Sequence, residues 1–437
     1  MKRINNSAIV LSLFVGMMYT NAQEKKQLSL DEAVQLGIQN SKSLKIDAAK
    51  IEEATADLLE AKNRQLPELK VSGSYMYLPI KPNIDLKLPG VSAAGGPEVH
   101  QVAYGSANLS VPIYSGGRIK YGIQSAKYLV EASKLSTEND KIAIAYNVAQ
   151  AYNNLFKANQ SIKVLEENLT ASQKRDETFL KLENNGVIAR NDRLKANLQT
   201  SNIELQLLEA KNNYNIANIN MDLLLGLPET TEIEVDKNYV DESDDVKPVS
   251  FYLNEARENR KDLQALDQQR KAAELGTKSA KAENLPSIAF TGGYVAADIP
   301  KFLTIYNAVN VGVGISYNLS NLWKENSALK QSKAREMQLS ATNELLNDNI
   351  KLDVNREYQN SDYSKKRITV FEKAAVQANE NYRITKNKYD NGLATMTELL
   401  DADAAQIAAN VGVINAKADA ALAYRKLLQT TGTLTIK

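Results

Sequence analysis

The chain has 437 residues, of which 43% are hydrophobic, and it contains no cysteine and a single histidine. The absence of cysteine excludes disulfides, thiolate metal sites, cysteine nucleophiles and an acylated N-terminal cysteine. Removal of a signal peptide with Lys2 and Arg3 leaves 51 basic against 52 acidic residues, a formal charge of −1. A balance so close to neutral argues against nucleic acid as a partner.

The first 22 residues have the three regions of a secretory signal peptide. Lys2 and Arg3 precede an apolar run from Ala8 to Met18, and small residues follow up to Ala22. The apolar run has about 11 residues, whereas a membrane-spanning helix needs roughly 20. We therefore predict cleavage after residue 22.

The remaining chain contains an internal duplication, in which the same sequence unit occurs twice. Pro67 recurs as Pro286, 219 residues later, and Gly186 recurs as Gly392, 206 residues later. The 13-residue difference between the two offsets indicates a deletion in the loop between the strands of the second copy. We predict a first repeat over 23–226, an acidic linker over 227–248 and a second repeat over 249–437.

Each repeat begins with helical patterning, which starts in the first copy at a cap-like Ser29 followed by Glu32 and which ends in both at a Leu-Pro pair. Segments in which apolar and polar residues alternate follow, and this period of two is typical of strands with one apolar face. The predicted strands are about 69–78, 102–114, 287–297 and 307–319.

After each pair of strands, a segment with almost no Pro or Gly predicts one unbroken helix. These helices are expected over Ile119–Glu183 and Glu325–Tyr389, each about 100 Å long. An Asn-Gly turn ends each one. Shorter helices follow over Asn191–Leu225 and Thr397–Thr430, and each is expected to be stacked end to end with the helix before the strands, beside the long helix.

Strands of about ten residues with one apolar face fit the outer membrane, where that face meets lipid. Four strands cannot close a barrel alone, and open edges are excluded within lipid because unpaired backbone groups are costly there. The edges must therefore pair with other chains, and three chains give twelve strands, an even number.

With these features the chain resembles the TolC family of outer-membrane efflux proteins over essentially the whole mature length. The resemblance depends on the duplication, the Leu-Pro and Gly-x-Tyr segments of the strands, and the motifs over Val111–Arg118 and Asn391–Ala402. No single motif is diagnostic, but together, in register in both copies, they are specific.

The resemblance implies an α+β membrane protein. Internally duplicated long helical hairpins form a coiled-coil tunnel of twelve helices across the periplasm of a Gram-negative bacterium, and two β-hairpins per chain contribute to a trimeric barrel of twelve strands in the outer membrane. The implied partners are outer-membrane lipid, a periplasmic membrane-fusion adaptor and an inner-membrane pump. The implied function is passive export of small molecules in a tripartite efflux system.

Two acidic residues follow the second Asn-Gly turn. Glu398 and Asp401 are three residues apart on one helix, so both carboxylates can point to the same side. The family positions that match them line the narrow periplasmic entrance, where a ring of acids favours cations. A solvated helix face beside a turn is the alternative interpretation.

Two further residues near the turns match family positions that hold the entrance closed. Asp192 lies six residues after Gly186, and Tyr389 lies three before Gly392. The family has an arginine two residues after the second glycine, where this chain has Ala394. Part of the family's closing contacts is therefore missing.

The turns themselves are candidate docking sites for the adaptor, although local packing of the turn explains their apolar residues nearly as well. The candidate docking residues are Asn185, Gly186, Val187, Ile188, Asn391, Gly392, Leu393 and Ala394.

No motif for a metal, nucleotide or dinucleotide is present, so we expect no cofactor and no enzymatic activity. Two alternatives stay open. One is an exit duct for type I protein secretion, and the other is a periplasmic coiled-coil structural protein, which leaves the alternating strands unexplained.

Overall fold

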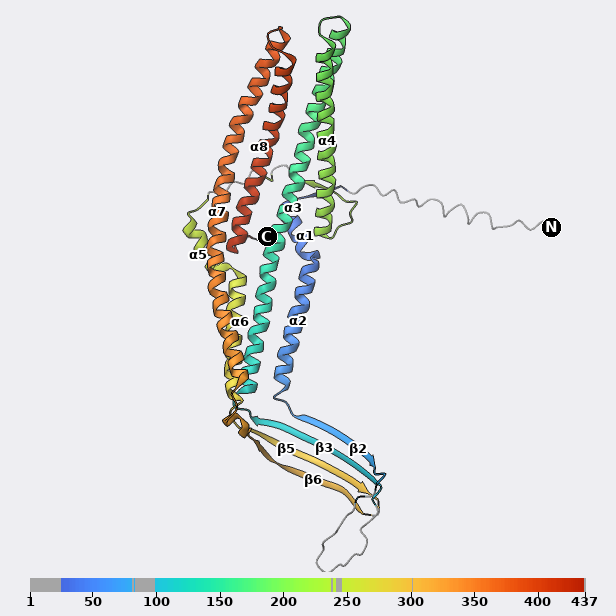
Figure 1. Cartoon of the computed structure of the whole chain (residues 1–437), viewed down its shortest axis with the longest axis vertical. Coiled ribbons are helices and arrows are strands. Elements are labelled where there is room, and N and C mark those ends of the chain that lie inside the picture. The colour runs from blue at the N-terminus through green and yellow to red at the C-terminus, as the bar shows by residue number, and fades with distance from the viewer. Residues whose placement is uncertain are drawn as a thin grey trace, which may run out of the picture. The chain divides into compact units, whose positions relative to one another are not determined.

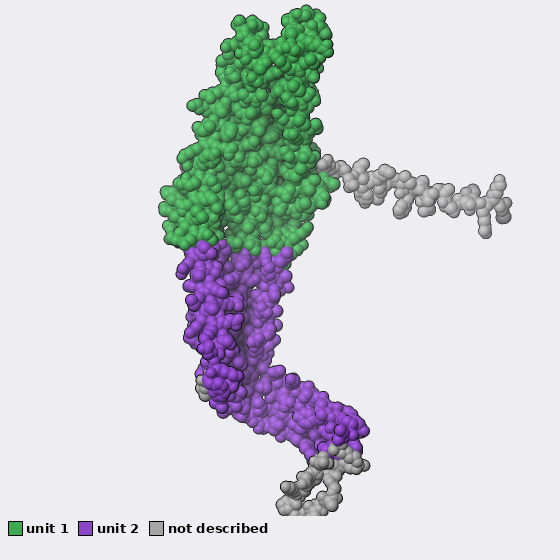
Figure 2. Space-filling view, viewed as in Figure 1, with its two compact units in different colours: residues 1–45, 138–260, 348–437 green, residues 46–137, 261–347 purple. Residues whose placement is uncertain are grey.

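The computed structural model describes residues 25–80, 82, 99–236, 239–240, 246–300 and 302–435. The predicted signal peptide over 1–22 and the acidic linker residues 241–245 lie outside the described residues. The chain divides into two compact units (Figure 2). Unit 1 comprises residues 1–45, 138–260 and 348–437, and unit 2 comprises residues 46–137 and 261–347.

The first copy begins with a short strand that was not predicted, and its helices and remaining strands follow in the predicted order (Figure 1). They are β1 (Lys25–Leu28), α1 (Leu30–Asn40), α2 (Lys42–Asn63), β2 (Glu68–Tyr77), β3 (Gln101–Tyr114), α3 (Arg118–Asn184) and α4 (Arg190–Leu225).

The second copy repeats this order after the short strand β4 (Glu232–Val235). Its elements are α5 (Val249–Asn259), α6 (Lys261–Ala282), β5 (Ser287–Ile299), β6 (Leu303–Ser316), a 3₁₀ turn (Leu319–Leu322), α7 (Ser327–Asp390) and α8 (Met396–Thr431). The last strand begins and ends earlier than predicted. It ends before Asn318, whose side chain accepts a bond from Ser320 N and caps the 3₁₀ turn.

The long helices are unbroken, as their composition predicts. The helix α3 has 67 residues and α7 has 64, which corresponds to about 100 Å each. The helical segment before each pair of strands is instead interrupted, at Ser41 and at Arg260, where the backbone is extended with ψ of 122° and 117°. Within the described residues, no helix has both the length and the apolar character needed to cross a membrane.

The core of unit 1 forms where β1 and β4 pair in parallel and pack on α3 and α4. The buried Tyr152 on α3 joins both strands, since its hydroxyl donates to Leu28 O at 2.9 Å and accepts from Asp236 N at 2.7 Å. The end of α1 meets the end of α4, where Asn40 Nδ2 donates to Leu225 O at 2.7 Å.

Unit 2 contains an antiparallel sheet with the strand order β2-β3-β5-β6. Three residues, 300–302, connect β5 to β6, whereas residues 78–100 connect β2 to β3. The shorter copy of the hairpin therefore has the shorter loop, as the change of offset predicts.

The two faces of this sheet differ in chemistry. The register places Asn108, Gly293 and Asn310 side by side on one face, and a Cβ at Gly293 would lie 2.9 Å from Asn310 Oδ1. On the same face, Ser72 and Ser106 bond through their hydroxyls at 2.9 Å. The other face carries apolar residues, which in the β6 strand are Val309, Val311, Val313 and Ile315, all at least 63% exposed.

Candidate functional site at the hairpin tips

Unit 1 ends in two helical hairpins, α3 with α4 and α7 with α8, whose tips are separate lobes in Figure 2. Gly186 and Gly392 have φ of 70° and 72°, the left-handed conformation that glycine adopts without strain. The bonds Val187 N to Leu182 O at 2.9 Å and Leu393 N to Lys388 O at 2.8 Å close both long helices in the same way. The two Asn-Gly turns thus have the same backbone conformation and the same closing hydrogen bonds.

The apolar residues of the turns fall into two groups. Val187 is 67% exposed and Leu393 is 77% exposed, so local packing of the turn does not account for them. Ile188 instead packs against a cluster around Phe179 inside unit 1. Asn185 and Asn391 are exposed, and Ala394 is half-buried.

The structure gives Glu398 a role that sequence reasoning missed. Its Oε2 accepts from Thr395 N at 2.7 Å and from Thr395 Oγ1 at 2.9 Å, while Glu398 N donates to Thr395 Oγ1 at 3.3 Å. This is a capping box at the start of α8, and the Thr-x-x-Glu spacing is its sequence signal. The backbone and side-chain bonds from Thr395 lower the pKa of Glu398, which keeps its charge. Asp401 is exposed one turn later.

Asp192 and Tyr389 lie within electrostatic reach of each other but make no direct hydrogen bond among the described residues. Asp192 Oδ1 pairs with Lys195 Nζ at 3.4 Å, and the Tyr389 ring meets the Phe179 ring edge-on at 5.8 Å. Burial, followed by the charge of Asp192, raises the pKa of Tyr389. Burial keeps this hydroxyl protonated and available as a donor.

The two hairpins are joined near the tips by a polar link that was not predicted from the sequence. Arg175 on α3 donates from Nη2 to Asp403 Oδ2 on α8 at 2.7 Å and from Nη1 to the Tyr382 hydroxyl on α7 at 3.2 Å. The side chains of Arg175 and Asp403 are only 13% and 7% exposed. The link continues to α4, because Arg175 also contacts Ser172 Oγ, which bonds Thr200 Oγ1 at 2.8 Å.

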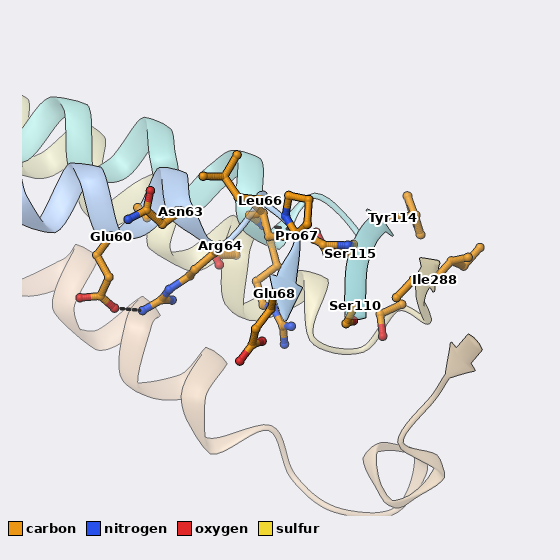
Figure 3. Close-up of a pocket in the computed structure, with 18 of the residues that line it drawn as sticks. Glu60, Asn63, Arg64, Leu66, Pro67, Glu68, Ser110, Tyr114, Ser115 and Ile288 are labelled. Carbon is orange, nitrogen blue, oxygen red and sulfur yellow. Dashed lines mark hydrogen bonds and ion pairs between the residues drawn. The ribbon is translucent and has the colours of Figure 1, made fainter. Parts of the chain in front are cut away.

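Unit 2 has a groove of about 920 Å³ where its helices meet the sheet (Figure 3). An ion pair between Arg64 and Glu60, at 2.8 Å, lies at the end of α2. Glu68 and Ser110 face each other across β2 and β3 and line the groove with Arg118. The groove therefore presents charges of both signs and belongs to the polar face of the sheet.

Comparison with known families decides what this architecture is. The model of the outer membrane efflux protein family matches residues 33–227 and 252–433, once in each copy. The chain belongs to the outer membrane efflux protein family. Its helical hairpins and paired β-hairpins are confirmed as the fold of that family, and the protein is located in the cell outer membrane.

Solved structures show the same fold at low sequence identity. The outer membrane protein VceC from Vibrio cholerae is 18% identical, with a TM-score of 0.77 over 92% of this chain and 96% of that chain. The CmeC outer membrane channel of Campylobacter jejuni is also 18% identical, with a TM-score of 0.76 over 93% and 86%. The MtrE outer membrane channel of Neisseria gonorrhoeae, solved in its open state, is 18% identical, with a TM-score of 0.74 over 93% of this chain and 89% of that chain. A search of curated proteins with this sequence found no match.

Proposed function

We propose that three copies of this outer membrane efflux protein form a passive tunnel that exports small molecules. The proposed mature subunit begins at Gln23 and comprises two repeats, 23–226 and 249–437, joined by the linker 227–248. A periplasmic adaptor and an inner-membrane pump complete the system. The pump supplies the energy, and the tunnel conducts solutes without covalent chemistry of its own.

The sheet of unit 2 is the observation that supports this proposal most directly. Its edge strands β2 and β6 each have one side without a strand partner in the described chain. Val71 on β2 and Val311 on β6 are both 74% exposed. An uncovered apolar face suits lipid, and open edges in lipid require strands from neighbouring copies. A twelve-stranded barrel from three copies satisfies both requirements, with the polar face lining a water-filled lumen.

Apolar stripes on the helices support contacts between copies. On α7, Leu345 and Leu352 are both 62% exposed, and Tyr363 and Val370 are 62% and 66% exposed. Each pair is seven residues apart, the spacing of a coiled-coil seam. Exposed leucines of α4 form a second stripe, which consists of Leu194, Leu198, Leu205 and Leu208.

At the tips, we propose that Glu398 and Asp401 of three copies line the entrance as an acidic ring, with Asp192 and Tyr389 beside it. Both carboxylates are exposed in the single chain. The exposed Val187 and Leu393, with the Asn-Gly turns, form the proposed docking surface for the adaptor's helical hairpin.

The assembly is tested by the mass of the detergent-solubilised protein from light scattering and by its conductance in planar bilayers. We expect a trimer that forms ion-conducting channels and that shows heat-modifiable mobility on gels. A soluble monomer without conductance contradicts the proposal.

The acidic ring is tested with a variant that removes charge but keeps the cap. Glu398→Gln preserves a residue that can complete the capping box. Combined with Asp401→Asn, it is expected to weaken block by multivalent cations severalfold in planar bilayers. Thr395→Ala is the matched control, since it removes the cap and retains both charges. Equal block in the wild type and the double variant excludes these two residues from the entrance ring.

A further inference from the structure

The strand pairing inside the sheet of unit 2 repeats with the duplication. Gly73 on β2 lies opposite Gly105 on β3, and their counterparts Gly292 and Val311 lie opposite each other on β5 and β6. Counterparts are residues 219 positions apart for β2 with β5 and 206 positions apart for β3 with β6, the two offsets of the sequence. The two β-hairpins of one chain therefore have the same register.

The contact of β3 with β5, which joins the two hairpins, is not repeated within the described sheet. Its counterpart would join β6 to β2, but these are the two edge strands (Figure 1). Three strand spacings, about 14 Å, separate the two edges. The counterpart contact can therefore form only between β6 of one copy and β2 of another.

On the apolar face, the duplication specifies this contact residue by residue. Leu109 lies opposite Gly292 within the chain. Leu109 corresponds to Ile315 at the offset of 206, and Gly292 corresponds to Gly73 at the offset of 219. An isoleucine opposite a glycine of the next copy thus repeats a leucine opposite a glycine within one copy.

On the polar face, the same mapping places hydroxyl groups together. Ser110 opposite Thr291 becomes Ser316 opposite Ser72 of the next copy. Because side chains alternate along a strand, a slip of one residue would join the polar face of one strand to the apolar face of the other. The register given by the duplication instead keeps both faces continuous from one copy to the next.

The serine pair also extends a row of serines that exists in the single chain. Ser72 Oγ and Ser106 Oγ lie 2.9 Å apart, and Ser287 lies opposite Ser316. Hydroxyl side chains that face each other across neighbouring strands stabilise their pairing. With Ser316 of one copy beside Ser72 of the next, four serines follow one another across the boundary between copies.

We propose that β6 of each copy pairs antiparallel with β2 of the next copy in the register that sets Ser316 opposite Ser72. This inference rests on the proposed trimer and names the residues that close it. Residues 311–316 then face residues 72–77 of the next copy, in reverse order. On the polar face, Gly312 lies opposite Met76, so the glycine leaves room for the longer side chain.

Disulfide formation tests the register, and the chain suits this test because it has no native cysteine. Ser72→Cys with Ser316→Cys places thiols at directly opposite positions, where Cα atoms about 4.5–5.5 Å apart allow a disulfide. Lys70→Cys or Ser74→Cys, each combined with Ser316→Cys, displaces one thiol by two residues, about 7 Å along β2. Within one copy, all three pairs span the sheet and are too far apart to react. A covalent product therefore reports contact between copies.

The matched control is the counterpart pair within one chain. Ser110→Cys with Thr291→Cys places thiols at positions that lie directly opposite each other on β3 and β5. This control should oxidise inside one chain and give no covalent multimer. Its rate of oxidation sets the scale for a directly opposite pair in the same sheet.

In the detergent-solubilised trimer, we expect Ser72→Cys with Ser316→Cys to give covalent dimers and trimers at a rate within about threefold of the control. The two displaced pairs should react at least about fivefold more slowly. Faster cross-linking of either displaced pair overturns the register. A trimer by mass in which only the control reacts overturns the pairing of β6 with β2, whereas a monomer by mass contradicts the proposed function itself.

Charges at the same two positions give an independent test. Ser72→Glu with Ser316→Glu places like charges opposite each other, whereas Ser72→Glu with Ser316→Lys places opposite charges there, and such cross-strand pairs destabilise and stabilise a sheet respectively. On heating at low salt, the like-charge trimer should dissociate at a lower temperature than the opposite-charge trimer, and high salt should reduce the difference. Equal dissociation temperatures at low salt would show that Ser316 does not face Ser72.

Discussion

Asp222 on α4 is fully buried, and its counterpart in the second copy is Leu428. Asn218 Nδ2 donates to Asp222 Oδ2 at 2.9 Å, while Oδ1 is without a hydrogen-bond partner among the described residues. Burial first, and the charge of Glu229 second, raise the pKa of Asp222 from 3.8 to about 6. An ionised Asp222 therefore opposes folding at neutral pH.

The sign of the pH dependence follows from this raised pKa. Between pH 4 and 6 the folded state binds more protons at Asp222 than the unfolded state, so this contribution to stability decreases as pH rises. Above pH 6 the ionised Asp222 lowers the free energy of unfolding by its full amount, roughly 2–3 kcal/mol for such a shift. We predict that Asp222→Asn raises the melting temperature at pH 7.5 and that its advantage over the wild type vanishes near pH 4.

Calorimetry of the detergent-solubilised protein across this pH range measures the difference. The control is Glu229→Gln, at an exposed position. It should raise the melting temperature at pH 7.5 by a smaller amount, because it removes the charge of Glu229 but leaves Asp222 buried. A stability difference that is independent of pH contradicts the assignment of the raised pKa to Asp222.

At the scale of the elements, the two hairpins differ in how their second helices begin. The helix α8 begins with the Thr395–Glu398 capping box, whereas α4 begins after Ala189, which makes no side-chain cap. Ala189 and Asp192 are the counterparts of Thr395 and Glu398 at the offset of 206. The start of α4 therefore lacks the stabilisation that the capping box gives to the start of α8.

We predict that Thr395→Ala weakens the start of α8 by about 1 kcal/mol, the usual contribution of such a cap. Hydrogen exchange of the amides in the first turn should become about fivefold faster. Conversely, Ala189→Ser should slow exchange at the start of α4. Thr397→Ala, two residues further along and exposed, is the control and should change little. Equal exchange in Thr395→Ala and Thr397→Ala contradicts a structural role for the cap.

The elements show how far local patterns determine the structure. The long helices, the four strands of the unit 2 sheet and both Asn-Gly turns could be predicted because each has a signal within a few residues, whereas the paired strands β1 and β4 were not predicted. The interruptions at Ser41 and Arg260 have no Gly or Pro to mark them, and tertiary packing decides them. The link from Arg175 to Asp403 joins residues 228 positions apart, so only the folded chain shows that the two meet.

At the scale of the whole molecule, one repeated unit forms two kinds of surface. One ion pair within each hairpin is the same in both copies, Glu166 with Lys211 and Glu372 with Lys417, whereas the charges of Arg175 and Asp403 between the hairpins have no charged counterparts. Comparison of the two copies could have marked Arg175 and Asp403 as divergent positions. It could not have shown their contact, because divergence alone does not say which helices are neighbours.

The proposed membrane placement of the sheet depends on which face of β6 meets lipid, and adjacent residues test it. Val311 lies on the apolar face opposite Gly292, and Asn310 lies on the polar face opposite Gly293. In the proposed barrel, Val311→Lys places a charge in lipid, which costs about 2–4 kcal/mol near the bilayer centre. Asn310→Lys places the same charge in the water-filled lumen at almost the same depth.

We predict that Val311→Lys strongly reduces the amount of heat-modifiable trimer in the outer membrane fraction and shifts refolding into lipid vesicles to lower urea concentration. Asn310→Lys should assemble at close to the wild-type level, because lysine in the lumen keeps its hydration, and should instead reduce cation conductance through repulsion. The two substitutions add the same side chain one residue apart, so strand propensity and net charge are matched. If both variants assemble equally well, the apolar face of β6 does not contact lipid.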